Sequence, residues 1–148
     1  MTSIVSNVEI SRPPEEVFAY VTDPSRFAEW QRDAADGRIE GDGPPTEGTR
    51  YTTTRRIGGI VPKKTTSEIT QIDPPKSWAA HGTGGPVRET VKYTVEPLDD
   101  HARSRVRIEL DFDGHGIGKL LVPLVVSRQA RKEMPINCRK LKERLEED

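Results

Sequence analysis

The segment covering residues 8–30 constrains the fold more strongly than any other part of this 148-residue chain. Apolar and polar residues alternate over residues 8–11, which is typical of a half-buried strand. Pro13 and Pro14 end that strand, and a proline in the first turn of a helix gives up no N–H that the helix needs. The segment therefore predicts a short strand followed at once by a helix.

Two short helices are expected after this strand. The apolar stripe of the first helix consists of Val17, Phe18 and Val21. Asp23 followed by Pro24 ends that helix and caps a second one. The second helix carries Phe27 and Trp30, two large apolar side chains that need a core to pack against.

A strand, then Pro-Pro-x-x-Val-Phe, then Asp-Pro and a Trp resemble the opening of the polyketide cyclase/dehydrase branch of the START-like (SRPBCC) superfamily. The ending LKERLEE resembles the closing helix of that family, so the resemblance covers nearly the whole chain. It implies the α+β helix-grip fold, in which a seven-stranded antiparallel sheet curls around a long C-terminal helix, with two short helices after the first strand. It also implies a cavity between sheet and helix for a lipid, sterol, polyketide or other apolar molecule.

The sequence after Trp30 predicts six further strands. A short strand is expected near residues 38–40, and longer ones at residues 49–57, 64–72, 77–82, 87–96 and 103–112. Short segments rich in Gly, Pro and Asp separate the longer strands, and connections of this length join antiparallel neighbours.

The alternation of apolar residues assigns an inward face to each strand. Pairing Tyr93 with Val106 in the last hairpin sets Glu96 opposite Arg103, Arg88 opposite Asp111 and Lys92 opposite Arg107. Carrying the same parity through the other hairpins turns inward Val87, Glu89, Val91, Trp78, Ala80, Ile69, Gln71, Tyr51, Thr53 and Arg55.

The end of the chain predicts one long helix over most of residues 117–145. Residues spaced by three and four share one face of it: Leu120, Leu124, Ser127, Arg131, Met134, Cys138, Leu141 and Leu145. Pro135 lies inside this pattern and is expected to bend the helix.

Length and composition predict a single domain over residues 1–148. The formal net charge of −1 provides no overall field for nucleic acid, so nucleic-acid binding is not expected. No run approaches the roughly 20 apolar residues of a membrane span, and the N-terminus lacks a signal-peptide pattern. We therefore expect a cytoplasmic protein without stable membrane insertion, while its oligomeric state stays open.

The sequence contains no evident catalytic motif. His81, His101 and His115 lie singly in or next to turns, without the spacing of metal ligands, so neither a metal site nor a cofactor is predicted. Cys138 falls on the apolar face of the predicted helix, where a small buried residue is expected.

Polar residues on inward faces are the candidates for a functional role. They either reach solvent at the rim of the sheet or line the mouth of the cavity and orient a polar end of the ligand. We expect Glu89 to be paired with Arg55 or Arg131, because an isolated buried charge is costly. The predicted ligand-binding residues are Tyr51, Thr53, Arg55, Ile69, Trp78, Glu89, Val91, Tyr93, Leu120, Leu124 and Arg131.

Three functions are consistent with these features. The leading hypothesis is a binding protein for a small hydrophobic molecule such as a lipid or polyketide. The first alternative is an enzyme of the polyketide cyclase/aromatase type that uses the same cavity, with Arg55, Glu89 and Tyr93 polarising carbonyls or moving protons. The second is a protein-interaction module, as in relatives that assist a chaperone or the quinone machinery, which calls for exposed apolar residues on the long helix.

Overall fold

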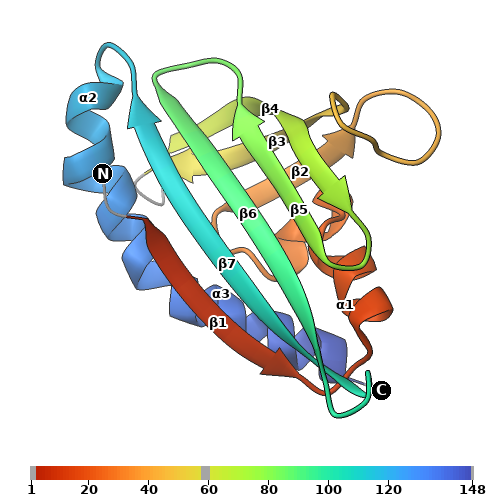
Figure 1. Ribbon diagram of the computed structural model, residues 1–148. Helices are drawn as coiled ribbons and strands as arrows, with labels where there is room; N and C mark the ends of the chain where they lie inside the picture. Colours follow the sequence, from red (N-terminus) through yellow and green to blue (C-terminus); the bar gives the residue numbers. More distant parts are fainter. Residues whose placement is uncertain (1–2, 58–60, 148) are drawn as a thin grey trace.

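The computed structural model describes residues 3–57 and 61–147, and it contains one antiparallel sheet (Figure 1). The strands are β1 (Ile4–Ile10), β2 (Ala34–Ile39), β3 (Arg50–Ile57), β4 (Val61–Asp73), β5 (Ser77–Gly82), β6 (Val87–Leu98) and β7 (Arg103–Gly114). They are ordered β1-β7-β6-β5-β4-β3-β2. The predicted seven-stranded antiparallel sheet is thereby confirmed.

Two short helices follow β1, and a long helical segment ends the chain. They are α1 (Pro14–Val21), the 3-10 helix η1 (Pro24–Glu29), α2 (Gly118–Leu121), the π-helical turn η2 (Val122–Val126) and α3 (Ser127–Glu146). The Asp23 carboxylate accepts a hydrogen bond from the Ser25 N–H (3.0 Å), which caps η1 as expected. Figure 1 shows α3 running along β1 and β7, with α2 and α1 at opposite ends of the sheet. Among the described helices, none is long and apolar enough to cross a membrane.

The register of the β6–β7 hairpin differs from the prediction by two residues. Tyr93 lies opposite Ile108, and Val106 lies opposite Val95. The strands extend to Leu98 and Arg103, so the turn is shorter than the sequence pattern suggested. A shift of two preserves the inward faces, and it places Lys92 opposite Glu109 rather than opposite another cation.

The inward orientation predicted for Gln71 is wrong. The pairing of β4 with β5 shifts between Ile69 and Gln71, and this bulge turns Gln71 to the surface. Its side-chain amide donates a hydrogen bond to the Ser77 hydroxyl (3.1 Å). Ile72 takes the position opposite Trp78 instead.

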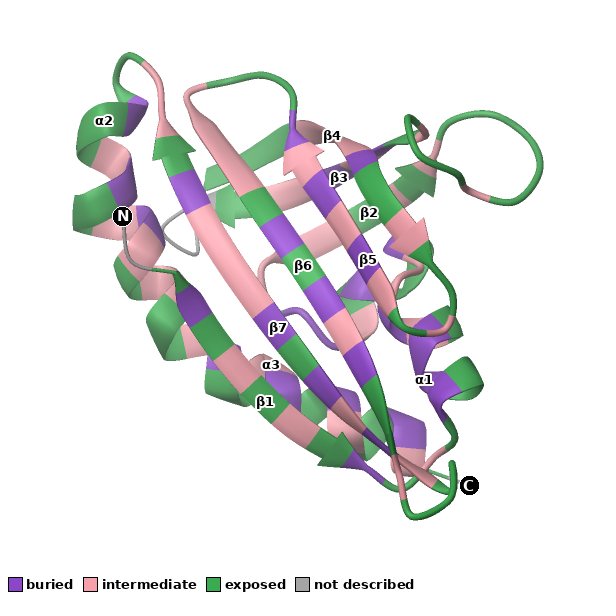
Figure 2. Cartoon of the chain, in the orientation of Figure 1, coloured by how far each residue is buried: buried purple, intermediate pink, exposed green. Residues whose placement is uncertain are grey.

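The face that the C-terminal helix turns to the sheet is predicted correctly from Met134 onward and incorrectly before it. Figure 2 shows buried residues along the side of the helix that meets the sheet. They are Val122, Val126, Met134, Cys138, Leu141 and Leu145. The π-helical turn η2 holds more residues per turn than an α-helix, so a constant α-helical spacing loses the correct phase there. α3 continues through Pro135 as one element.

Aromatic side chains fill the end of the sheet that α1 and η1 cover. The Phe27 ring lies 6.0–6.4 Å, centroid to centroid, from the rings of Trp30, Tyr51 and Trp78. Trp78 stacks on Tyr93 at 5.1 Å, as their opposite positions on β5 and β6 require. All five rings are buried, so this end of the sheet is a packed core.

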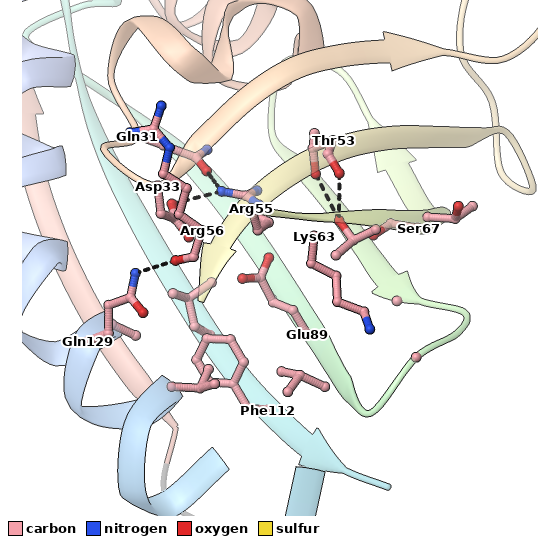
Figure 3. A pocket seen from close by; sticks show the side chains of 18 of the residues that line it. Gln31, Asp33, Thr53, Arg55, Arg56, Lys63, Ser67, Glu89, Phe112 and Gln129 are labelled. Atoms are coloured by element: carbon pink, nitrogen blue, oxygen red, sulfur yellow. Dashed lines mark hydrogen bonds and ion pairs between the residues drawn. The ribbon is translucent and has the colours of Figure 1, made fainter. Parts of the chain in front are cut away.

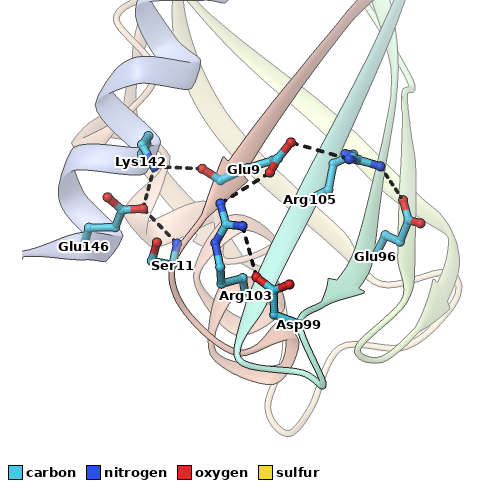
Figure 4. A network of polar contacts seen from close by, with 8 residues as sticks. All are labelled: Glu9, Ser11, Glu96, Asp99, Arg103, Arg105, Lys142 and Glu146. Carbon is cyan, nitrogen blue, oxygen red and sulfur yellow. Dashed lines mark hydrogen bonds and ion pairs between the residues drawn. The ribbon is translucent and has the colours of Figure 1, made fainter.

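Charged residues cover the outer face near the C-terminus and form a network (Figure 4). The Glu9 carboxylate bridges Arg103 (3.3 Å) and Arg105 (3.4 Å), and Arg105 also reaches Glu96 (3.3 Å). Lys142 of α3 donates to the Glu9 carbonyl (3.0 Å). Arg103 and Arg105 on β7 are thus paired with carboxylates of the neighbouring strands β1 and β6, which favours a structural role for both arginines.

Candidate functional site: a polar-rimmed cavity

A cavity of about 510 Å³ lies between the sheet and the C-terminal helix (Figure 3). It is at the end of the sheet where β3 connects to β4 and β5 connects to β6. Gln129 of α3 donates a hydrogen bond to the Arg56 carbonyl of β3 (2.9 Å), which joins helix and sheet at the side of this space. The volume of the cavity matches that of the pockets in which proteins bind small organic ligands.

One wall of the cavity is apolar. It is built from inward-facing residues of β6 and β7 together with the buried side of the helix: Val87, Leu110, Phe112, Val126, Ala130 and Met134. The alternation of inward and outward residues along β6 and β7 produces the sheet part of this wall. The helical phase set by η2 turns Val126, Ala130 and Met134 toward the cavity and produces the rest.

The opposite wall is polar and comes from β3 and β4. Thr53 and Thr65 face each other across these strands, and their hydroxyl oxygens lie 3.0 Å apart in a hydrogen bond. Arg55 and Lys63 form the next opposite pair on this face toward the hairpin end. Since all four residues line the cavity, a ligand there meets hydroxyl and cationic groups on one side and hydrocarbon on the other.

A hydrogen-bonded network closes the inner end of the cavity. Arg55 donates to the Asp33 carboxylate (3.1 Å) and to the side-chain carbonyl of Gln31. The Gln31 amide donates in turn to the Tyr93 hydroxyl (3.2 Å). Burial disfavours the Arg55 cation, but Asp33 and Glu89 outweigh that cost and raise the pKa of Arg55. Burial also raises the pKa of the Tyr93 phenol, so this network holds a cation and a neutral hydroxyl.

Glu89 lies on the cavity wall with its carboxylate directed toward Arg55 (Figure 3). Burial raises the pKa of the Glu89 carboxyl, Arg55 partly offsets the increase, and Asp33 adds to it. Within the described residues, the Glu89 side chain makes neither a hydrogen bond nor an ion pair. The expected attraction to Arg55 is present, but Asp33 occupies the direct contact with that guanidinium.

The structure separates the predicted ligand-binding residues into three groups. Thr53, Arg55, Glu89 and Tyr93 line the cavity. Tyr51, Ile69, Trp78 and Val91 are buried in the core and do not line it, so the expectation that Tyr51 and Trp78 touch the cavity is wrong. The third group, Leu120, Leu124 and Arg131, lies outside the cavity.

The expectation that Leu120 and Leu124 face the sheet is also wrong, because they are 60% and 57% exposed. Together with Ile117, which is 61% exposed, they put apolar surface on the start of the helix, a feature that the hypothesis of a protein-interaction module calls for. Arg131 is exposed and borders a separate hollow beside Pro123, and within the described residues no ion pair joins it to Glu89.

Several cavity residues were not predicted as ligand-binding, notably Trp30, Lys63 and Ala130. One sequence signal could have located the cavity. The inward residues of β5 shrink from Trp78 through Ala80 to Gly82, which removes side-chain volume toward the end of the strand.

Among the described residues, no group of three His, Cys, Asp or Glu side chains is placed to hold a metal ion.

Solved structures similar to this chain share its fold at low sequence identity. One is the di-domain ARO/CYC BexL from the BE-7585A biosynthetic pathway, with a TM-score of 0.72 and 18% identity, which covers 97% of this chain and 46% of that one. A START superfamily protein from Mycobacterium smegmatis matches with a TM-score of 0.77 and 15% identity over 97% of each chain. A protein from Thermus thermophilus matches with a TM-score of 0.73 and 17% identity, again over 97% of each.

A comparison with curated proteins finds no match. The family described as "Polyketide cyclase / dehydrase and lipid transport" matches residues 1–146. Since that match extends over nearly the whole chain, and the fold agrees with the START superfamily structure, the chain belongs to this polyketide cyclase/dehydrase and lipid transport family.

Proposed function

We propose that this protein binds a small amphipathic molecule in the cavity between the sheet and the start of the C-terminal helix. The observation that carries the proposal is the cavity itself, about 510 Å³ in volume, with one apolar and one polar wall. The apolar body of the ligand packs against Phe112, Val126 and Met134. Its polar groups face the hydroxyls of Thr53 and Thr65.

The family description and the packed core beside the cavity support this proposal. The description of the family includes lipid transport, and a cavity partly lined by hydrocarbon suits a lipid. The aromatic cluster around Phe27 gives the adjoining region a rigid packed structure, so the space does not depend on ligand to hold it open.

A cavity-filling substitution tests the proposal. Ala130 lies on the helix wall, and Ala130→Trp places an indole in the ligand space. The matched control is Leu124→Trp, which adds the same ring to the exposed side of the same helical segment. We expect Ala130→Trp to weaken binding of dodecanol at least about tenfold in isothermal titration calorimetry, equivalent to roughly 1.4 kcal/mol. Equal affinities in the two folded variants contradict the proposal, as does a wild-type protein that binds no apolar probe.

A second candidate function is acid–base catalysis in the same cavity. It is favoured by the Glu89 carboxyl, whose pKa is raised and which lies on the cavity wall near the Arg55 guanidinium. The relative BexL carries ARO/CYC in its name, and a poly-β-ketone is a substrate on which such a pair could act. In that case Glu89→Gln lowers the kcat for cyclisation by roughly 10²–10⁴ and leaves KM nearly unchanged. Equal kcat values for Glu89→Gln and wild type exclude this role.

A further inference from the structure

The charge around the cavity is unevenly distributed. Residues 49–67 include all of β3 and the first half of β4. This segment contains five cations and no Asp or Glu, although the net charge of the chain is −1. All five border the cavity: Arg50, Arg55, Arg56, Lys63 and Lys64. The carboxylates among the lining residues are Asp33, Glu89 and Glu133, so the cavity wall carries more positive than negative groups.

The cations at the inner and outer ends of the cavity differ in whether a carboxylate of the protein pairs with them. At the inner end, Arg55 is bound by Asp33 and lies in the field of Glu89, so its charge is already balanced. At the outer end, the Lys63 ammonium makes no hydrogen bond or ion pair with any described residue. Positive charge that the protein has not itself neutralised is therefore found at the mouth.

Lys63 is placed to meet a ligand. It lies opposite Arg55 in the β3–β4 register and therefore on the same, inward face of the sheet. Its side chain extends across the mouth toward the β5–β6 connection, where its Cε lies 4.0 Å from the position that a Cβ on Gly85 would occupy. Figure 3 shows Lys63 beside Glu89 on the cavity wall.

We propose that the ligand is an amphipathic anion, with its apolar body inside the cavity and its negatively charged end held at the mouth by Lys63. The proposal rests on the proposed function and adds a ligand class and an orientation to it. Asp33 and Glu89 repel an anion from the inner end, and Phe112 and Val126 offer hydrocarbon contact in between. Carboxylates on an acyl chain and on an aromatic ring share this chemistry.

Three dodecyl probes that differ in charge test the proposal, with the two ions kept below their micelle concentrations and dodecanol below its solubility limit. We expect calorimetry at low salt to show dodecanoate binding at least about tenfold more tightly than dodecanol, and dodecyltrimethylammonium binding more weakly than both. The same comparison between 2-naphthoate and 2-naphthol distinguishes an aromatic from an acyl body, because the better-fitting body gives the tighter anion.

Two matched charge reversals locate the anion. Lys63→Glu is expected to lower dodecanoate affinity at least about tenfold more than it lowers dodecanol affinity, because only the anion loses an attraction and gains a repulsion. Lys76→Glu makes the same change on an exposed residue between β4 and β5, away from the cavity lining, and is expected to alter neither. Measuring dodecanol in every variant shows that the protein is folded and its cavity intact.

The outcomes separate this inference from the proposed function. If dodecanol binds and dodecanoate has no advantage, or if Lys63→Glu leaves that advantage intact, the anionic class is overturned and the binding function stands. A preference for dodecyltrimethylammonium likewise overturns it and points to Glu89 as the anchor. If none of the dodecyl or naphthyl probes binds, the proposed function itself fails.

Discussion

The two ends of the sheet follow the same alternation of inward and outward residues, yet one end is filled and the other is hollow. At the end covered by α1 and η1, the rings of Phe27, Tyr51 and Trp78 interlock and are buried. At the end near α2, inward positions hold Thr65 and Gly82, which supply far less side-chain volume than the aromatic rings do. Inward parity therefore identifies which side chains face the helix, while side-chain volume decides whether they form a core or a cavity.

The largest expected effect comes from comparing an aromatic ring in the filled end with one beside the cavity. Phe27→Ala removes a ring that contacts other aromatic rings, and we expect a loss of roughly 3–5 kcal/mol in the free energy of unfolding. Phe112→Ala should cost clearly less, because one side of that ring already faces empty space and loses fewer contacts. Urea denaturation measures both, and equal costs would refute the distinction between the two ends.

Tryptophan fluorescence offers an optical form of the same comparison. Trp30 lines the cavity, whereas Trp78 is fully buried in the filled end. We expect Trp30→Phe to abolish most of the emission change that an apolar ligand produces, and Trp78→Phe to retain it. The opposite pattern would place the ligand in the filled end.

The smallest expected effect concerns the pH dependence of stability. The pKa of Glu89 is raised in the folded protein, so the folded state holds this proton more tightly than the unfolded state does. Stability from this group is therefore largest below the ordinary glutamate pKa of about 4.3 and falls as pH rises toward the folded value. Glu89→Gln removes that loss, and its Tm should rise relative to wild type through this window.

Thermal unfolding from acid to neutral pH checks this prediction. The same substitution at Glu143, an exposed residue of α3, corrects for the general effect of removing one negative charge. A Tm difference that stays constant across the pH range, after that correction, would show that burial at the cavity wall does not perturb Glu89.

The fold follows from the sequence because its evidence is repeated along the chain. Alternation in several successive strands, turn residues between them and a long terminal helix all favour one architecture. The two-residue error in the β6–β7 register arose at the turn after Leu98, where four residues make the reversal and three of them, Asp99, Asp100 and His101, have positive φ. No simple spacing rule predicts such a turn from residues that are not glycine.

The position of the cavity was harder to predict because it depends on two local irregularities and on volume. The bulge after Ile69 turned Gln71 outward, and the π-helical turn η2 moved Leu120 and Leu124 to the surface. Parity alone also could not show that Phe27 and Trp30 would occupy the space above Trp78. Arg55 and Glu89 were found because charged residues at inward positions are conspicuous wherever the cavity lies.

Methyl NMR tests the central claim, that ligand binds at the hollow end of the sheet, most directly. In a titration with dodecanol or dodecanoate, whichever binds more tightly, we predict the largest shifts at Val87, Leu110 and Val126, which line the cavity. The methyl groups of Val95, Val106 and Leu141, which are buried outside the cavity lining, should shift little. Large shifts confined to this second group would contradict the account.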